Sequence, residues 1–189
     1  VISLLVICGV DAMSQITAIK AGKLLDPESG TIAANQIILV EAGKIRAVGA
    51  GVPIPKDANV IDLSNSTVLP GLFDAHSHLC QMTSPDNRDL FTTDIRQTTS
   101  YRAIIGVKSA REYLDSGFTT VRDVGNNSNY ADTAVRQALA NSLVPRPTII
   151  NAGRIIAPFG GQYHLQPERR ELGNPEYIFA DTRDEMVKA

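Results

Sequence analysis

Apolar and polar positions follow a strand-like pattern over the first third of the chain. Four runs of strand length occur, at residues 16–21, 36–41, 44–49 and 60–63. Short runs of this kind, separated by Gly, Pro, Asp and Ser, predict β-strands. Ala42-Gly43 joins the second run to the third and predicts a tight hairpin. About fifty residues of this type form a small β module and not a complete core.

The pattern changes near residue 67, where longer helical periods begin to alternate with apolar strands. Strands are predicted at residues 67–73, 118–124 and 147–152, and helices at 98–116 and 131–143. In the first helix Ala103, Val107, Ala110 and Leu114 share the apolar face. Thr182 to Glu185 has the sequence of a capping box and predicts a last helix. Strand and helix in strict alternation indicate parallel β/α units.

Two architectures contain parallel β/α units, the closed barrel and the open doubly wound sheet. An eight-unit barrel needs about 250 residues, and residues 67–189 supply about three units. The doubly wound alternative lacks its glycine fingerprint, because Gly49-Ala50-Gly51 follows a strand but opens no helix. We therefore expect residues 67–189 to form the first part of a (β/α)8 TIM barrel.

Two histidines stand one residue apart where the strand 67–73 ends. Side chains at i and i+2 of an extended segment point to the same side, so His76 and His78 can reach a common point. Two imidazoles that converge are half of a metal site. Asp74 stands two residues before His76, on the same face of the expected strand. The alternative is a pair of histidines that form hydrogen bonds in an ordinary loop.

Charge and cysteine content exclude several classes of function. The net charge of -2 leaves no basic surface for nucleic acid and no polybasic membrane patch. The two cysteines, Cys8 and Cys80, have no metal-type spacing, and a disulfide framework is not expected. Cys80 is interpreted as a small packed residue.

Residues 1–14 have the pattern of a secretory signal. Val1 to Val10 is almost purely apolar, and Ala12 and Ser14 fit a small-x-small cleavage site ahead of Gln15. The run is too short to span a bilayer. The sequence thus predicts a secreted or periplasmic protein, and the alternative is a buried first strand.

These segments together resemble the amidohydrolase superfamily, in its imidazolonepropionase-like and Xaa-Pro-dipeptidase-like branch. The segments that resemble the family are residues 38–45, residues 68–79 around the two histidines, and Gly117 to Gly125. The resemblance covers roughly residues 16 to 189. It implies that residues 15–66 contribute to a β-sandwich beside the metal-bearing barrel.

The resemblance also implies a site and a chemistry. His76 and His78 correspond to the metal ligands of the first barrel strand, and the metal, one or two ions, is expected to be zinc. The remaining ligands and the catalytic acid or base are expected beyond Ala189, so this chain alone is expected to be inactive. His164, after the third strand, is a candidate for binding substrate, and a plain loop histidine is the alternative.

The predicted function is hydrolysis of a C–N bond by metal-activated water. The substrate would be an amide, a dipeptide or a cyclic amide. A deaminase of the same superfamily and a non-catalytic barrel used for binding are the alternatives. No nucleic-acid partner is expected. The sequence does not distinguish a monomer from a homo-oligomer.

Overall fold

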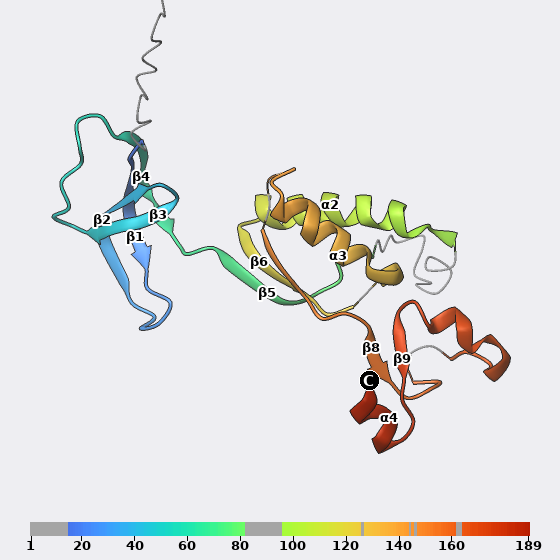
Figure 1. Cartoon of the computed structure of the whole chain (residues 1–189). Helices are drawn as coiled ribbons and strands as arrows, with labels where there is room; N and C mark the ends of the chain where they lie inside the picture. Colours follow the sequence, from blue (N-terminus) through green and yellow to red (C-terminus); the bar gives the residue numbers. More distant parts are fainter. Residues whose placement is uncertain (1–14, 82–95, 126, 144, 146, 162–163) are drawn as a thin grey trace, which may run out of the picture. The chain divides into compact units, whose positions relative to one another are not determined.

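The computed structural model describes residues 15–81, 96–125, 127–143, 145, 147–161 and 164–189. It divides into two compact units, Val1–Pro70 and Gly71–Ala189 (Figure 1). The predicted signal segment, residues 1–14, lies outside the described residues. Among the helices of the described part, none is long and apolar enough to cross a membrane.

The first unit is a four-stranded sheet. Its strands are β1 (Thr17–Leu25), β2 (Ile32–Glu41), β3 (Lys44–Gly49) and β4 (Asn59–Val68), in the order β3-β2-β1-β4. Strand β1 pairs antiparallel with β2 and parallel with β4. Ala42 and Gly43 both have positive φ, at 51° and 73°, which confirms the predicted hairpin. A second sheet, which a sandwich requires, stays a prediction.

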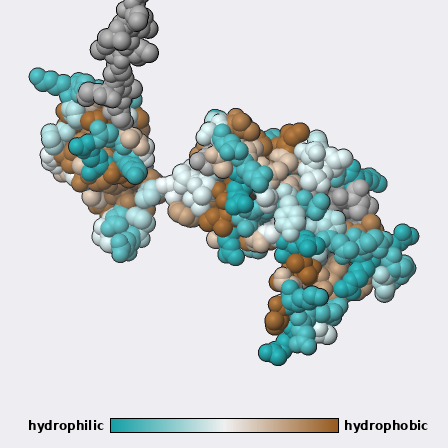
Figure 2. Space-filling model, viewed as in Figure 1, coloured by the Kyte–Doolittle hydropathy of each residue, from teal (hydrophilic) through white to brown (hydrophobic). Residues whose placement is uncertain are grey.

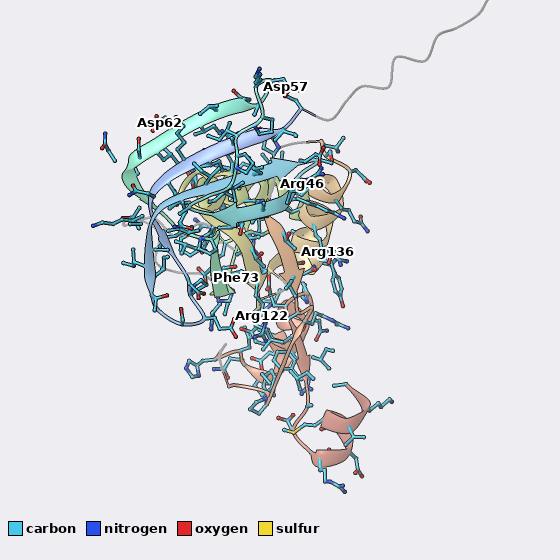
Figure 3. The ribbon with its side chains drawn as sticks, turned by 90° about the vertical axis from the view of Figure 1, so that its left-hand side faces the viewer. Arg46, Asp57, Asp62, Phe73, Arg122 and Arg136 are labelled. Carbon is cyan, nitrogen blue, oxygen red and sulfur yellow. The ribbon has the colours of Figure 1, made fainter. Side chains whose placement is uncertain are left out.

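The surface of this sheet carries two ion pairs between neighbouring strands. Arg46 on β3 pairs with Glu41 at the end of β2, and Lys20 on β1 lies 4.0 Å from Asp62 on β4 (Figure 3). These side chains are between about one third and two thirds exposed to solvent, so each pair adds little stability. The buried Ala18, Ala21, Ile38 and Leu39 hold this unit together instead.

The second unit begins with a parallel three-stranded sheet covered by two helices. The elements are β5 (Leu72–Ser77), α2 (Thr99–Asp115), β6 (Phe118–Asp123), α3 (Asn127–Ala140) and β7 (Thr148–Asn151). The strand order is β5-β6-β7, and both helices lie on the same face of the sheet (Figure 1). Two successive β/α units are therefore present, where the alternating pattern predicts about three: β7 is followed by β8, η1 and β9 and not directly by a helix.

Four smaller elements follow β7. They are β8 (Ile155–Ala157), the 3-10 helix η1 (Pro167–Gly173), β9 (Tyr177–Phe179) and α4 (Arg183–Lys188). Strands β8 and β9 form a parallel pair. The capping box at Thr182 and Glu185 opens α4 and confirms that prediction. The other three elements are too short for the apolar pattern to predict them.

The boundary between the units corrects the predicted strand 67–73. Strand β4 continues through Thr67 to Val68, and β5 begins only at Leu72. Pro70 has no backbone N–H to donate to a sheet, so one strand could not continue through it.

The helix faces also differ from the prediction. Helix α2 buries Arg102, Ile105, Gly106 and Ala110, whereas Ala103 and Val107 are only partly buried. Helix α3 begins at Asn127 rather than Ala131. The core between these helices and the sheet includes Leu79, Cys80, Ala110, Val121, Val135, Leu139 and Ile149.

Apolar residues also reach the surface of both units (Figure 2). On the parallel sheet Phe73 is 74% exposed and Ile150 is 54% exposed. Arg122, which pairs with Ile150 in register, is exposed as well (Figure 3). Alternate positions on β6 and β7, Val121 and Ile149, are buried under the helices. The described residues of this unit therefore leave the face opposite the helices uncovered.

The core of the second unit contains ionisable groups. Among the described residues, the buried polar or charged side chains are Ser77, Arg102, Asp123, Asp132 and Glu176. Arg102 Nη1 lies 3.4 Å from Glu176 Oε1, and Arg102 Nε donates to the Cys80 carbonyl at 3.1 Å. An ion pair removed from water in this way is costly to break, because either partner alone would be an uncompensated buried charge.

Gly106 allows α2 and α3 to approach each other, and we expect Gly106→Ala to destabilise the second unit. A Cβ at this position would lie 2.7 Å from Cys80 Sγ and 2.8 Å from Val135 Cγ2. The free energy of unfolding should fall by roughly 1–3 kcal/mol, although Ala is favoured over Gly by about 1 kcal/mol in an open helix. Urea unfolding followed by far-ultraviolet circular dichroism measures it. Gly51→Ala, where a Cβ meets nothing within 4 Å, is the control and should change little.

Asp123 should make stability depend on pH. Burial is the main cause that raises the pKa of Asp123 to about 7, with smaller contributions from Asp132 and Glu176, while N–H donation from Leu79 and Gly125 acts in the opposite direction. The folded state therefore holds a proton that the unfolded state releases near pH 4. This contribution to stability is complete at low pH and is lost as pH rises through about 7.

The measurement is urea unfolding of metal-free protein from pH 5 to 8, which spans the window set by the raised pKa of Asp123. The side chain at position 123 does not titrate in the Asp123→Asn variant. The difference in the free energy of unfolding between wild type and variant should therefore shrink as pH rises. A difference that stays constant with pH would contradict the assignment.

Candidate metal centre

The two histidines lie where β5 ends. His76 is in the strand and His78 follows its last residue, Ser77. Their ring centroids are 5.3 Å apart, with the ring planes at 75° to each other. His76 is exposed and His78 is half-buried. Two imidazoles at this separation can face one ion, as the i and i+2 spacing predicts.

An irregularity in β5 determines which way the histidines face. Asp74 pairs with Val121 and Ser77 pairs with Asp123, so β5 has one more residue than β6 between these pairs. Such a bulge reverses the alternation of side chains beyond it. Ser77 is buried on the helix side, and His76 consequently projects to the uncovered face.

The bulge overturns the expectation that Asp74 shares a face with His76. The Asp74 carboxylate accepts the backbone N–H of His76 at 2.9 Å, a local turn contact, and does not orient its ring. On the other side Asp74 lies beside Tyr113 of α2, where burial and this carboxylate raise the pKa of the Tyr113 hydroxyl. Asp74 thus supports the shape of the strand end.

His78 has the properties of a neutral ligand. Burial, and secondarily the neighbouring His76, lower the pKa of His78 below its usual range. A neutral imidazole has a free lone pair for a metal ion. Nδ1 of His78 is buried and has no hydrogen-bond partner among the described residues. A buried nitrogen without a partner is costly, and coordination is one way to satisfy it.

The donor set of the described residues is small. Among them, no group of three or more His, Cys, Asp or Glu side chains is placed to hold a metal. Catalytic zinc usually has three protein ligands, so His76 and His78 can supply only part of a coordination sphere. Cys80 is not a third ligand in this arrangement: it is fully buried in the core, and burial raises the pKa of its thiol to about 12. Its interpretation as a packed residue is confirmed.

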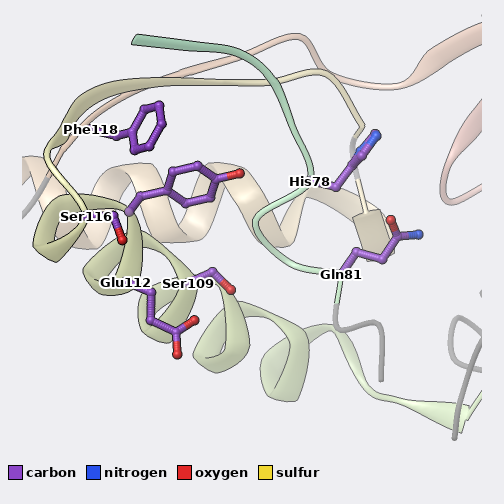
Figure 4. A pocket seen from close by; sticks show the side chains of 7 residues that line it. His78, Gln81, Ser109, Glu112, Ser116 and Phe118 are labelled. Carbon is purple, nitrogen blue, oxygen red and sulfur yellow. The ribbon is translucent and has the colours of Figure 1, made fainter. Parts of the chain in front are cut away.

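A cavity of about 350 Å³ lies beside His78 (Figure 4). Its lining consists of His78, Gln81, Ser109, Glu112, Tyr113, Ser116 and Phe118. Most of these residues belong to α2 or to the start of β6, and His76 is not part of the lining that the structure describes. The cavity therefore adjoins one histidine and is not the space between the two rings.

His164 lies in the segment ahead of η1 and is exposed. Its predicted contact with substrate stays a prediction. Asp123 accepts the N–H of Leu79. Arg102, which is paired with Glu176, donates to the Cys80 carbonyl. No functional role was predicted for these three residues from the sequence. Two features of the sequence could have pointed to them: Arg102 occupies an apolar position of a helix, and Asp123 stands at the end of a strand.

Comparison with known proteins identifies the family. A model of the amidohydrolase family matches residues 67–189, which is more than half of the chain. A dihydroorotase from Geobacter sulfurreducens is 34% identical over 132 residues, which cover 67% of this chain and 27% of that protein.

Solved structures agree with this match. A Xaa-Pro dipeptidase with bound methionine in its active site superposes with a TM-score of 0.68 and 34% identity, over 78% of this chain and 35% of the dipeptidase. A further amidohydrolase superposes with a TM-score of 0.71 and 27% identity, over 92% of this chain and 43% of the other. The chain thus spans less than half of each of these proteins. It has an α/β fold and belongs to the amidohydrolase family.

Proposed function

We propose that this chain is the part of a metal-dependent hydrolase that supplies the first two metal ligands, His76 and His78. The observation that carries the proposal is the pair of imidazoles at a strand end, 5.3 Å apart, with the buried Nδ1 of His78 lacking a partner in the described structure. The ends of barrel strands are where β/α barrels build their active sites.

The proposed reaction is hydrolysis of a C–N bond in an amide, a dipeptide or a cyclic amide. A divalent ion, proposed to be zinc, would lower the pKa of a bound water and polarise the substrate carbonyl. His76 and His78 would hold the ion, while the bulge at Asp74 aims His76 to the open face of the sheet. His164 is proposed to contact the substrate.

The relatives favour different substrates. The dihydroorotase similarity favours a cyclic amide, and the dipeptidase similarity favours a dipeptide. A deaminase would release ammonia and no new carboxylate, and a binding protein would take up ligand without turnover. Product analysis with a cyclic ureide, a set of Xaa-Pro dipeptides and an amino-substituted heterocycle separates these functions.

Replacement of both histidines by alanine should abolish stoichiometric zinc in the product of the complete reading frame. Each lost ligand leaves the ion short of donors, so the loss in affinity should exceed the ~10–100-fold typical of residues that only support ligands. Elemental analysis after dialysis measures it. His164→Ala is the matched control and should retain zinc. Metal at the wild-type level in the double variant would refute the assignment.

We also propose that the protein is exported and that its mature chain begins near Gln15. The apolar run of residues 1–10 and the small residues Ala12 and Ser14 support this. N-terminal sequencing of protein from the periplasm or medium should give a start at or near Gln15. Mature protein that retains residues 1–10 would favour the buried-strand alternative.

A further inference from the structure

The residue after His78 is held by a buried carboxylate on the next strand. The backbone N–H of Leu79 donates to Asp123 Oδ2 at 2.8 Å. Both residues are fully buried. A buried N–H that loses its acceptor carries the full desolvation cost.

The Asp123 carboxylate is itself fixed in position. Its second oxygen, Oδ1, accepts the backbone N–H of Gly125 at 3.1 Å. The Asp123 carbonyl accepts the N–H of Ala152, just beyond β7, at 3.0 Å. One residue therefore joins the ends of β5, β6 and β7, and its side chain has little freedom to follow a shift of the turn.

Further hydrogen bonds hold the turn on both sides of Leu79. The Ser77 hydroxyl donates to the Arg122 carbonyl at 3.1 Å, and the Ser77 carbonyl accepts the N–H of Val124 at 3.1 Å. On the other side, Arg102 Nε donates to the Cys80 carbonyl at 3.1 Å. The backbone on either side of His78 is thereby fixed, whereas Nδ1 of its ring is without a partner in the described structure.

We infer that Asp123 is a positioning residue for the metal centre, which fixes the backbone at Leu79 and thereby aims the imidazoles of His76 and His78. This inference rests on the proposed function. Asp123 touches neither imidazole in the described contacts, so it acts through the backbone and is not itself a ligand. Its loss should change the geometry and affinity of the metal site more than the fold.

The test compares two buried aspartates by the same isosteric substitution. Asp123→Asn keeps the shape but leaves one acceptor oxygen for two N–H donors. Asp132→Asn is the matched control, because Asp132 is also fully buried but its Oδ2 accepts Asn151 Nδ2 at 2.9 Å and not a backbone N–H of the turn. Wild type and both variants are made as the complete reading frame, and unfolding midpoints are recorded.

The probes are Zn²⁺ affinity by competition with a chelating dye and the visible spectrum of the Co²⁺-substituted protein. Asp123→Asn should weaken Zn²⁺ binding by about 10-fold or more and change the Co²⁺ spectrum. Asp132→Asn should leave both unchanged even if it lowers the unfolding midpoint. Unchanged affinity and spectrum in Asp123→Asn, or equal changes in both variants, would overturn the inference.

A wild type that binds no metal would instead refute the proposed function, so the two failures are distinct. If the Asp123→Asn variant does not fold, amide hydrogen exchange in the wild-type protein tests the inference instead. Coupling is reciprocal, so an ion held by the aimed histidines must stabilise the bond that aims them. Zn²⁺ should therefore slow exchange of the Leu79 and Gly125 amides, and equal exchange with and without Zn²⁺ would overturn the inference.

Discussion

The carboxylate of Asp123 is the contact on which the second unit depends most. Parallel strands have no hairpins to set their relative positions, and their ends must be aligned by other groups. Asp123 does this for β5, β6 and β7 through Leu79, Gly125 and Ala152. The first two groups donate to the side-chain oxygens and Ala152 donates to the backbone carbonyl, and a typical hydrogen bond contributes about 0.5–1.5 kcal/mol. The bulge in β5 and the direction of His76 follow from the register that these bonds maintain.

A carboxylate in this position has an electrostatic cost, and the surrounding charges do not offset it fully. Among the described residues, three buried carboxylates, Asp123, Asp132 and Glu176, accompany one buried guanidinium, that of Arg102. Arg102 is paired with Glu176, so Asp123 relies on backbone N–H groups. Burial is the main cause of the raised pKa of Asp123, and the neighbouring carboxylates of Asp132 and Glu176 add to it. A shifted pKa of a buried group is typical of functional sites, and Asp123 lies beside the proposed metal centre.

The sequence predicted what depends on local pattern. The hairpin at Ala42-Gly43 and the capping box at Thr182 are each encoded within a few residues, and the alternation of strand and helix is encoded in the apolar spacing within each segment. The bulge in β5 is not, because it is defined by pairing with β6, about forty-five residues away by the separation of Ser77 and Arg122. The buried position of Arg102 likewise depends on Glu176, from a distant part of the chain. The i and i+2 rule predicted that the two histidine rings lie close together, and their centroids are 5.3 Å apart. It also placed Asp74 on their face, which is wrong, because the rule assumes an uninterrupted strand.

The uncovered face of the sheet relates the proposed metal centre to the rest of the family fold. His76 projects to the face that also carries the exposed Phe73 and Ile150. In a closed β/α barrel the face opposite the helices is the interior, filled by side chains from alternate strands. We therefore expect Phe73 and Ile150 to be covered in the closed barrel, and His76 to stand at the mouth of that interior. Two imidazoles fix where an ion would sit, but the ligands and substrate contacts from other strands decide which C–N bond it would cleave.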